Sequence, residues 1–239
     1  VPILTFGHPG VGFRGIARDV TEREEMKRQV QDGLRKLEST IDRTIQAISL
    51  IVEARDGYTA GHQKRTSQLS CAIAERMGLP KDQVRVVQIA ALLHDIGKIA
   101  VPSEILTKPG RLSAMEIELI RTHSRVGYEI LRTVDFPWPI ADIVHQHHER
   151  LDGSGYPLGL KDEDISIEAK ILAVADVVEA MTSRRPYRLA RGIEEALAEI
   201  SVNSGRLYDG DVVFACLDVF NGGGFSFENA ALLSEWYHS

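Results

Sequence analysis

Histidines and carboxylates gather in the middle of this 239-residue chain. Six of the eight histidines fall between residues 62 and 148, and carboxylates at three nearby positions could act with them. These residues are His62, His94, His123, His145, His147, His148, Asp95, Glu149 and Asp176. Imidazole and carboxylate ligands without thiolates are typical of hydrolytic sites that hold two metal ions of iron, manganese or zinc. One His on an apolar helix is more often a hydrogen-bonded core residue, but six in one helical region favour a metal site.

The pair His94-Asp95 follows an apolar run, Val84 to Leu93, that has helical spacing, and Gly97 and Lys98 come directly after it. Adjacent residues on an α-helix point about 100° apart, so the pair can share a metal only near a helix end. The sequence puts it at such an end. An Asp there could bridge two cations through its two oxygens. Taken alone, the pair could also be ordinary helix-end chemistry.

An all-α fold is predicted for the chain after Arg55, because apolar residues recur at helical spacing between turn signals. Gly78 ends one helix, Pro80 begins the next, and Ser113 with Glu116 has the spacing of a capping box. The helices are expected at about 59–77, 80–95, 113–132, 140–148, 168–183, 193–203 and 210–220. No strand pairing is expected after residue 20.

A long helix is predicted before this region, and it carries a heptad seam. The seam residues recur at alternating steps of four and three: Val30, Leu34, Leu37, Ile41, Thr44, Ile48 and Ile51. A parallel coiled-coil dimer that carries a signal is the favoured interpretation. The alternative is a single amphipathic helix that lies on its own domain.

Composition limits the class of protein. The chain is 44% hydrophobic and carries a net charge of -6, so non-specific binding of a nucleic-acid duplex is not expected. The two cysteines, Cys71 and Cys216, lie in apolar helical patterns and predict reduced thiols in a cytoplasmic protein. No apolar run is long enough to span a bilayer. Because the sequence begins at Val1 without Met, an anchor farther upstream is left open.

A series of short motifs resembles the HD-GYP domain, a branch of the HD metal-dependent phosphohydrolases. The motifs are Asp56–His62 (DGYTAGH), His94–Pro102 (HDIGKIAVP), Lys108–Gly110 (KPG), Thr122–His123, His147–Glu149 (HHE), Asp152–Pro157 (DGSGYP), Ala175–Asp176 and Arg185–Arg188 (RPYR). Together they cover roughly residues 50 to 220. Separately, Gly12 to Arg23 resembles the last strand and exit of a PAS sensor domain, with a generic Gly-rich tail as the alternative.

The resemblance implies a centre of two metal ions bridged by Asp95. His62, His94 and Asp176 would complete one metal site with Asp95, and His123, His147 and His148 would complete the other. Iron or manganese is expected, with zinc, magnesium and nickel as alternatives. Some family members place a third metal with a Glu four residues before the first His, but this position is Tyr58 here.

The resemblance also implies a set of substrate contacts. Lys98 would meet phosphoryl oxygens. The loop Gly155-Tyr156-Pro157 would lie beside the substrate and meet a protein partner, although a Gly-Pro turn with a buried aromatic ring is the alternative. Glu179 stands where the family usually has an Asp that meets guanine. Arg185 and Arg188 would bind phosphate or guanine, or simply form a solvated helix end. Glu149 would orient a ligand, and His145 would lie outside the ligand set.

The implied activity is hydrolysis of cyclic di-GMP to pGpG, with further hydrolysis to GMP left open, by a hydroxide between the two cations. The rival hypotheses are a weak or inactive nucleotide sensor, an interaction module, and a phosphohydrolase for another cyclic dinucleotide. The expected organisation is that of a bacterial signalling output protein. Its parts are a PAS-like remnant at 1–21, a linker and dimerisation helix at 22–53, a catalytic domain at 54–220, and a tail helix at 221–239.

Overall fold

The computed structural model describes residues 3–7, 14–18, 21–56, 61–183, 192–222 and 225–227. The chain divides into two compact units, Val1–Thr44 and Ile45–Ser239. The predicted metal ligands all lie in the second unit.

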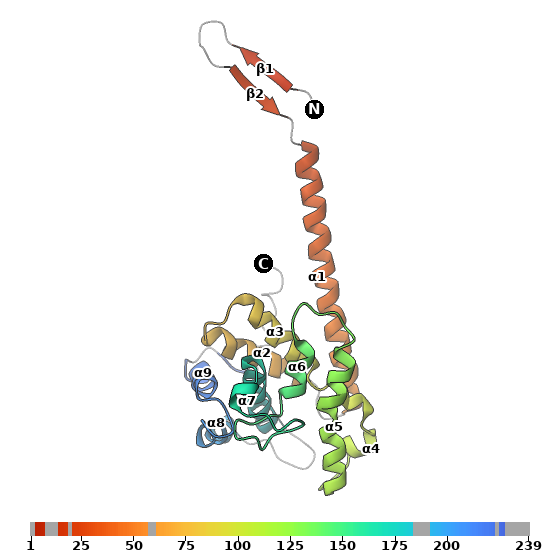
Figure 1. Cartoon of the computed structure of the whole chain (residues 1–239), viewed down its shortest axis with the longest axis vertical. Coiled ribbons are helices and arrows are strands. Elements are labelled where there is room, and N and C mark those ends of the chain that lie inside the picture. The colour runs from red at the N-terminus through yellow and green to blue at the C-terminus, as the bar shows by residue number, and fades with distance from the viewer. Residues whose placement is uncertain are drawn as a thin grey trace. The chain divides into compact units, whose positions relative to one another are not determined.

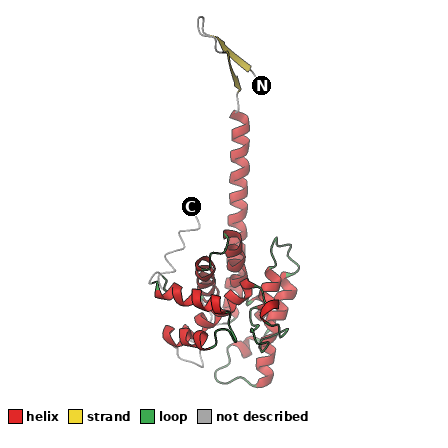
Figure 2. Ribbon diagram, turned by 60° about the vertical axis from the view of Figure 1, so that its left-hand side comes forward, coloured by secondary structure: helices red, strands yellow, loops and turns green. Residues whose placement is uncertain are grey.

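The first unit contains a β-hairpin and the start of a long helix. Strands β1 (Ile3–Gly7) and β2 (Arg14–Arg18) pair antiparallel, with Ile3 opposite Arg18, and are the yellow arrows of Figure 2. Strand β2 falls within the segment that resembles the end of a PAS domain, and its origin in such a domain stays a prediction. Helix α1 (Thr21–Arg55) follows and continues into the second unit.

The second unit is a helical bundle, which confirms the all-α prediction for this part of the chain (Figure 1). Its elements after α1 are α2 (His62–Arg76), α3 (Lys81–Leu93), η1 (Ile96–Ala100), α4 (Ser103–Leu106), α5 (Ala114–Leu131), α6 (Ile140–Gln146), η2 (Asp162–Asp164), α7 (Ile167–Thr182), α8 (Ile193–Val202) and α9 (Gly210–Asn221). The sequence pattern missed the three short elements η1, α4 and η2, because a single turn has no periodicity to detect. None of the described helices is both long and apolar enough to cross a membrane.

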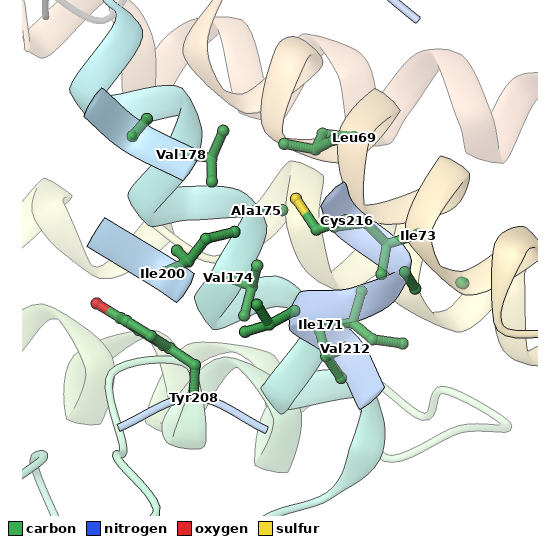
Figure 3. Packing of buried hydrophobic residues seen from close by; sticks show 14 of the residues in the cluster. Leu69, Ile73, Ile171, Val174, Ala175, Val178, Ile200, Tyr208, Val212 and Cys216 are labelled. Carbon is green, nitrogen blue, oxygen red and sulfur yellow. The ribbon is translucent and has the colours of Figure 1, made fainter. Parts of the chain in front are cut away.

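Helix α7 is the central helix of the bundle and packs against α2, α3, α6, α8 and α9. Ten of its 16 residues are buried, and one apolar cluster joins it to α2, α8 and α9 (Figure 3). Two buried carboxylates, Asp176 and Glu179, interrupt the apolar part of this helix. A buried charge is costly unless it is paired and hydrogen-bonded, so both acids must have partners inside the bundle.

The last turns of α1 belong to the core of the bundle. Ile45 and Val52 are buried in a second apolar cluster with residues of α3 and α6. The predicted boundary between residues 53 and 54 falls inside this packed part of α1. Of the predicted tail helix, residues 228–239 lie outside the described part of the chain.

Candidate metal centre

Seven side chains that the sequence predicts as metal ligands come together inside the bundle. They are His62 at the start of α2, His94 and Asp95 directly after α3, His123 in α5, His147 and His148 directly after α6, and Asp176 in α7. Six of them are buried, and His148 is partly buried. The prediction that the His94-Asp95 pair lies at a helix end is confirmed, because α3 ends at Leu93.

The first group of ligand atoms comes from His62, His94 and Asp176, whose atoms lie within 4.8 Å of one another. Oδ1 of Asp176 is 3.3 Å from Nε2 of His62 and 3.8 Å from Nε2 of His94. The buried carboxylate of Asp176 in α7 therefore faces two imidazoles.

The second group comes from His123, His147 and His148, also within 4.8 Å of one another. Nε2 of His123 lies 3.3 Å from Nε2 of His147. Gly97 allows η1 to pack closely against α5, which carries His123. A Cβ atom at Gly97, in η1, would lie 1.9 Å from the carbonyl oxygen of His123, so only glycine fits there.

Asp95 lies between the two groups, with one oxygen facing each. Its Oδ2 is 3.5 Å from Nε2 of His94 and 3.8 Å from Nε2 of His62. Its Oδ1 is 3.7 Å from Nε2 of His123. This is the arrangement that a carboxylate needs to bridge two cations.

Three of the histidines have their tautomer fixed by the backbone. Nδ1 of His94, His123 and His147 lies 2.7, 2.7 and 2.6 Å from the carbonyl oxygen three residues earlier. Because a carbonyl only accepts, Nδ1 must carry the proton and donate it, which leaves a lone pair on Nε2. All three Nε2 atoms face the centre, so these rings are set up as metal ligands.

Charge favours cation binding at this centre. Burial lowers the pKa of His123, and it holds the pKa of His147 and His148 well below the usual value, so these rings are neutral. Burial alone would raise the pKa of Asp95, but Lys98 and the nearby histidines hold it well below its usual range. Neutral imidazoles with ionised carboxylates are the donor set of divalent metals, so the residues present fit such ions.

His62 differs from the other histidines. Burial by itself lowers its pKa, but Asp176 and Glu179 accept its hydrogen bonds and raise the pKa to about 9. Two carboxylates therefore flank this ring, and they favour a positive charge at His62.

Glu179 lies beside His62 inside the bundle, and its predicted contact with guanine stays a prediction. Its side chain is fully buried, and its carboxylate contacts Nδ1 of His62. It also accepts from Arg65, whose Nη2 is 2.6 Å away, and from the hydroxyl of Ser183 at 2.6 Å. With these partners the carboxylate orients the ring of His62.

Lys98 is buried beside the bridging carboxylate. Its Nζ is 2.7 Å from Oδ2 of Asp95 and 3.2 Å from Oδ2 of Asp56. The predicted contact of Lys98 with a phosphoryl group stays a prediction. Asp56 was missed as a functional residue, although it opens the first motif, because nothing in the sequence pairs it with a lysine 42 positions away.

The Gly155-Tyr156-Pro157 loop covers the side of the second group. The Tyr156 ring stacks on His148 with centroids 4.6 Å apart, and Cζ of Arg121 lies 5.0 Å from the centroid of Tyr156. The Tyr156–Pro157 peptide bond is cis. Sequence reasoning missed Arg121, because the charge pattern of α5 is that of an ordinary solvated face.

Glu149 holds this loop in place. Its carboxylate is buried and accepts from the backbone N–H groups of Leu158, Gly159 and Leu160 at 2.7, 3.2 and 3.0 Å. A Cβ at Gly155 would lie 2.4 Å from Cα of Glu149, so the loop needs glycine at this close approach. Glu149 therefore anchors the loop whose Tyr156 ring stacks on His148, one of the predicted metal ligands.

The remaining predicted residues lie apart from the centre or outside the described residues. His145 stacks on Tyr128, with ring centroids 4.6 Å apart, and is absent from each group of ligand atoms among the described residues. Tyr58, Arg185 and Arg188 lie outside the described part of the chain.

Comparisons with known proteins identify relatives of this chain. The chain is 40% identical over 194 residues to the cyclic di-GMP phosphodiesterase response regulator RpfG of Xanthomonas campestris, covering 80% of this chain and 51% of that protein. It is 42% identical over 194 residues to a cyclic di-GMP phosphodiesterase of Thermotoga maritima, with 80% and 53% covered. It is 34% identical to the 3'3'-cGAMP-specific phosphodiesterase 3 of Vibrio cholerae, with 78% and 41% covered. The chain spans about half the length of the first two relatives.

Solved structures support the fold. The cyclic GMP-AMP specific phosphodiesterase V-cGAP3 of V. cholerae matches with a TM-score of 0.60 at 18% identity, over 81% of this chain and 52% of that chain. Bd1817, described as an HDG"Y"P protein from Bdellovibrio bacteriovorus, matches with a TM-score of 0.56 at 21% identity, over 67% and 52%.

The family model described as HD domain matches residues 46–212. This range begins in the packed part of α1 and includes all seven candidate ligands. Because the match spans more than half of the sequence, the chain belongs to the HD domain family.

Proposed function

We propose that this domain is a metal-dependent phosphodiesterase that hydrolyses cyclic di-GMP to pGpG. The observation that carries the proposal is the position of Asp95, whose two oxygens face two separate groups of imidazole and carboxylate ligands. The relatives named as cyclic di-GMP phosphodiesterases support the substrate.

In this proposal each group holds one divalent metal ion. His62, His94 and Asp176 would hold the first, His123, His147 and His148 would hold the second, and Asp95 would contribute to both. Iron or manganese is expected, because the donors are imidazole and carboxylate without thiolate. Such a pair of cations, when bound, neutralises charge on the phosphodiester and lowers the pKa of water toward neutrality.

The chain itself contributes orientation and charge. Backbone carbonyls fix three imidazoles with Nε2 toward the centre, and Glu179 does the same for His62. Lys98 keeps Asp95 ionised and is proposed to meet phosphoryl oxygens once substrate binds. The Tyr156 loop is proposed as the substrate side and as a contact for a protein partner. Arg185 and Arg188 stay the predicted ligands of phosphate or guanine.

The test is a product assay with defined metals. The purified chain is reconstituted with ferrous iron without oxygen, or with manganese, and incubated separately with cyclic di-GMP, 3'3'-cGAMP and cyclic di-AMP. Chromatography then separates pGpG from GMP. We expect pGpG as the first product of cyclic di-GMP. Tight binding of cyclic di-GMP without product under either metal would refute turnover and support a sensor.

A second candidate substrate is 3'3'-cGAMP. Three relatives at 34–36% identity are named as phosphodiesterases specific for it. The same assay decides, through the ratio of kcat/KM for the two substrates.

We also propose a homodimer formed through α1. Val30, Leu34, Leu37 and Ile41 of the heptad seam are 46–58% exposed, which is unusual for a regular apolar stripe. Sedimentation at micromolar concentration tests this, with Leu34→Glu and Leu37→Glu expected to give monomers. The matched control is Glu38→Gln on the same helix. A monomeric wild-type chain would refute the dimer for this chain.

A cytoplasmic location is part of the proposal. Cys71 and Cys216 are both free thiols, and burial raises the pKa of each to about 12. Such thiols are inert in a reducing compartment. Fractionation of cells that produce the full-length protein is the direct measurement.

A further inference from the structure

Glu53 is an acid buried in the last turns of α1, with only 8% of its surface exposed. Its two oxygens accept hydrogen bonds from two backbone N–H groups of another segment. Oε2 accepts from Gly61 at 2.9 Å, and Oε1 accepts from Gln63 at 3.1 Å. The residue between these two donors is His62.

These donors belong to the N-terminus of α2, where N–H groups have no partner within the helix. The residue at the N-cap position is Gly61, with φ +76°, so it has no side chain that could accept from them. A negative charge is favoured at this end of a helix. Glu53 therefore caps α2 from α1, and it holds the backbone on both sides of His62.

A second contact runs from the same end of α1 to Asp95. Asp56, the residue after α1, has its Oδ2 3.2 Å from Nζ of Lys98, and Lys98 Nζ lies 2.7 Å from Oδ2 of Asp95. Residues at the end of α1 thus contact the segment that begins with His62 and the lysine that pairs with Asp95. His62 is a member of the first group of ligands, and Oδ2 of Asp95 faces that group.

We propose that Glu53 is a positioning residue for His62, and that the end of α1 sets the geometry of the first metal site. The metal-binding part of this inference needs only the ligand assignment, and only its turnover part rests on the proposed function. A shift of α1 along or about its axis would then act on His62 through Glu53.

The test compares Mn²⁺ binding by calorimetry in the full chain and in Glu53→Gln, Glu53→Ala and the control Glu38→Gln. Glu38 is an exposed acid on the same helix. We expect Mn²⁺ affinity at one of the two sites to fall about 10-fold or more in both Glu53 variants, the usual effect of losing a group that orients a ligand. Binding at the other site and in Glu38→Gln should match the wild type.

Turnover gives a second readout. Activity of Glu53→Gln should fall at low Mn²⁺ and recover at high Mn²⁺, since the ligands themselves remain. Unchanged affinity in Glu53→Gln, even with a lower melting temperature, would overturn the proposal, because Glu53 would then only cap α2. Failure of both variants to fold would overturn it as well. A wild type that binds Mn²⁺ but hydrolyses no cyclic dinucleotide would refute the proposed function and leave the Glu53 comparison intact.

Discussion

Nζ of Lys98 lies 2.7 Å from Oδ2 of Asp95, the oxygen that faces His62 and His94. Lys98 is only 9% exposed, and its second carboxylate partner, Asp56, is also buried. The ammonium group therefore balances two buried negative charges beside the metal centre. Removing one partner of such an arrangement leaves buried charge without compensation.

Lys98→Met should therefore destabilise the chelator-treated protein by about 3 kcal/mol, the usual scale for breaking a buried ion pair. Urea unfolding of chelator-treated protein measures this. Adding Mn²⁺ should recover part of the loss, because a cation at Asp95 also compensates the charge.

The control for Lys98→Met is Lys81→Met at the start of α3, an exposed lysine whose loss should change the free energy of unfolding little. Equal stability of the two variants would contradict the charge-balancing role of Lys98.

His94→Ala should abolish turnover and lower the metal content, because it removes a ligand whose Nδ1 is already held by Ala91. Helix content by circular dichroism should stay near the wild-type level. Elemental analysis and the product assay provide the two measurements.

His145→Ala is the matched control, since His145 stacks on Tyr128 and lies apart from the ligand groups. A His94→Ala variant with a near-normal rate would remove the basis of the metal assignment.

Part of the candidate site could be predicted from the sequence because its signals are local. His94 and Asp95 end an apolar run of helical spacing, and His147 precedes His148 and a motif rich in glycine. The main helices could be predicted for the same reason. Such signals need no knowledge of how helices pack.

The partners of the ligands could not be predicted in this way. Glu179 meets His62 across 117 positions, and Lys98 meets Asp56 across 42. Which acid faces which ring depends on how α1, α2 and α7 pack, and periodicity carries no information about that. Glu53 shows the same limit, because a Glu in an amphipathic helix is normally a solvated residue.

Glu149→Ala should weaken substrate binding more than metal binding. The variant loses the acceptor of three backbone N–H groups, so the loop that carries Tyr156 loses its anchor. A hydrogen bond to a charged group contributes about 1.5 kcal/mol or more, so KM should rise about 10-fold or more. Mn²⁺ stoichiometry should stay unchanged, as measured by calorimetry.

Glu163→Gln, an exposed acid in η2, serves as the control for Glu149→Ala. Loss of bound Mn²⁺ in Glu149→Ala with an unchanged KM would place Glu149 in the metal site instead of the loop.

The capping box of α5 should give the domain a defined acid sensitivity. Hydrogen bonds from Lys108, and then from Ser113, lower the pKa of Glu116 from 4.5 to about 2. Because the pKa is lower in the folded state, the stabilisation is complete above the unfolded pKa of 4.5 and is lost as the pH falls toward 2. The difference in unfolding free energy between wild type and Glu116→Gln should therefore be largest above pH 4.5 and shrink progressively below it.

Denaturant unfolding of both proteins across this pH range measures that difference, and Lys108→Gln separates the lysine from the cap. Nζ of Lys108 is 2.7 Å from Oε1 of Glu116, while the N–H of Ser113 is bonded to Oε2 at 2.7 Å. In the Lys108→Gln background the serine bonds remain, so the pH dependence should weaken without vanishing. A difference that stays constant from neutral pH down to pH 2 would mean that Glu116 is not ionised in its cap.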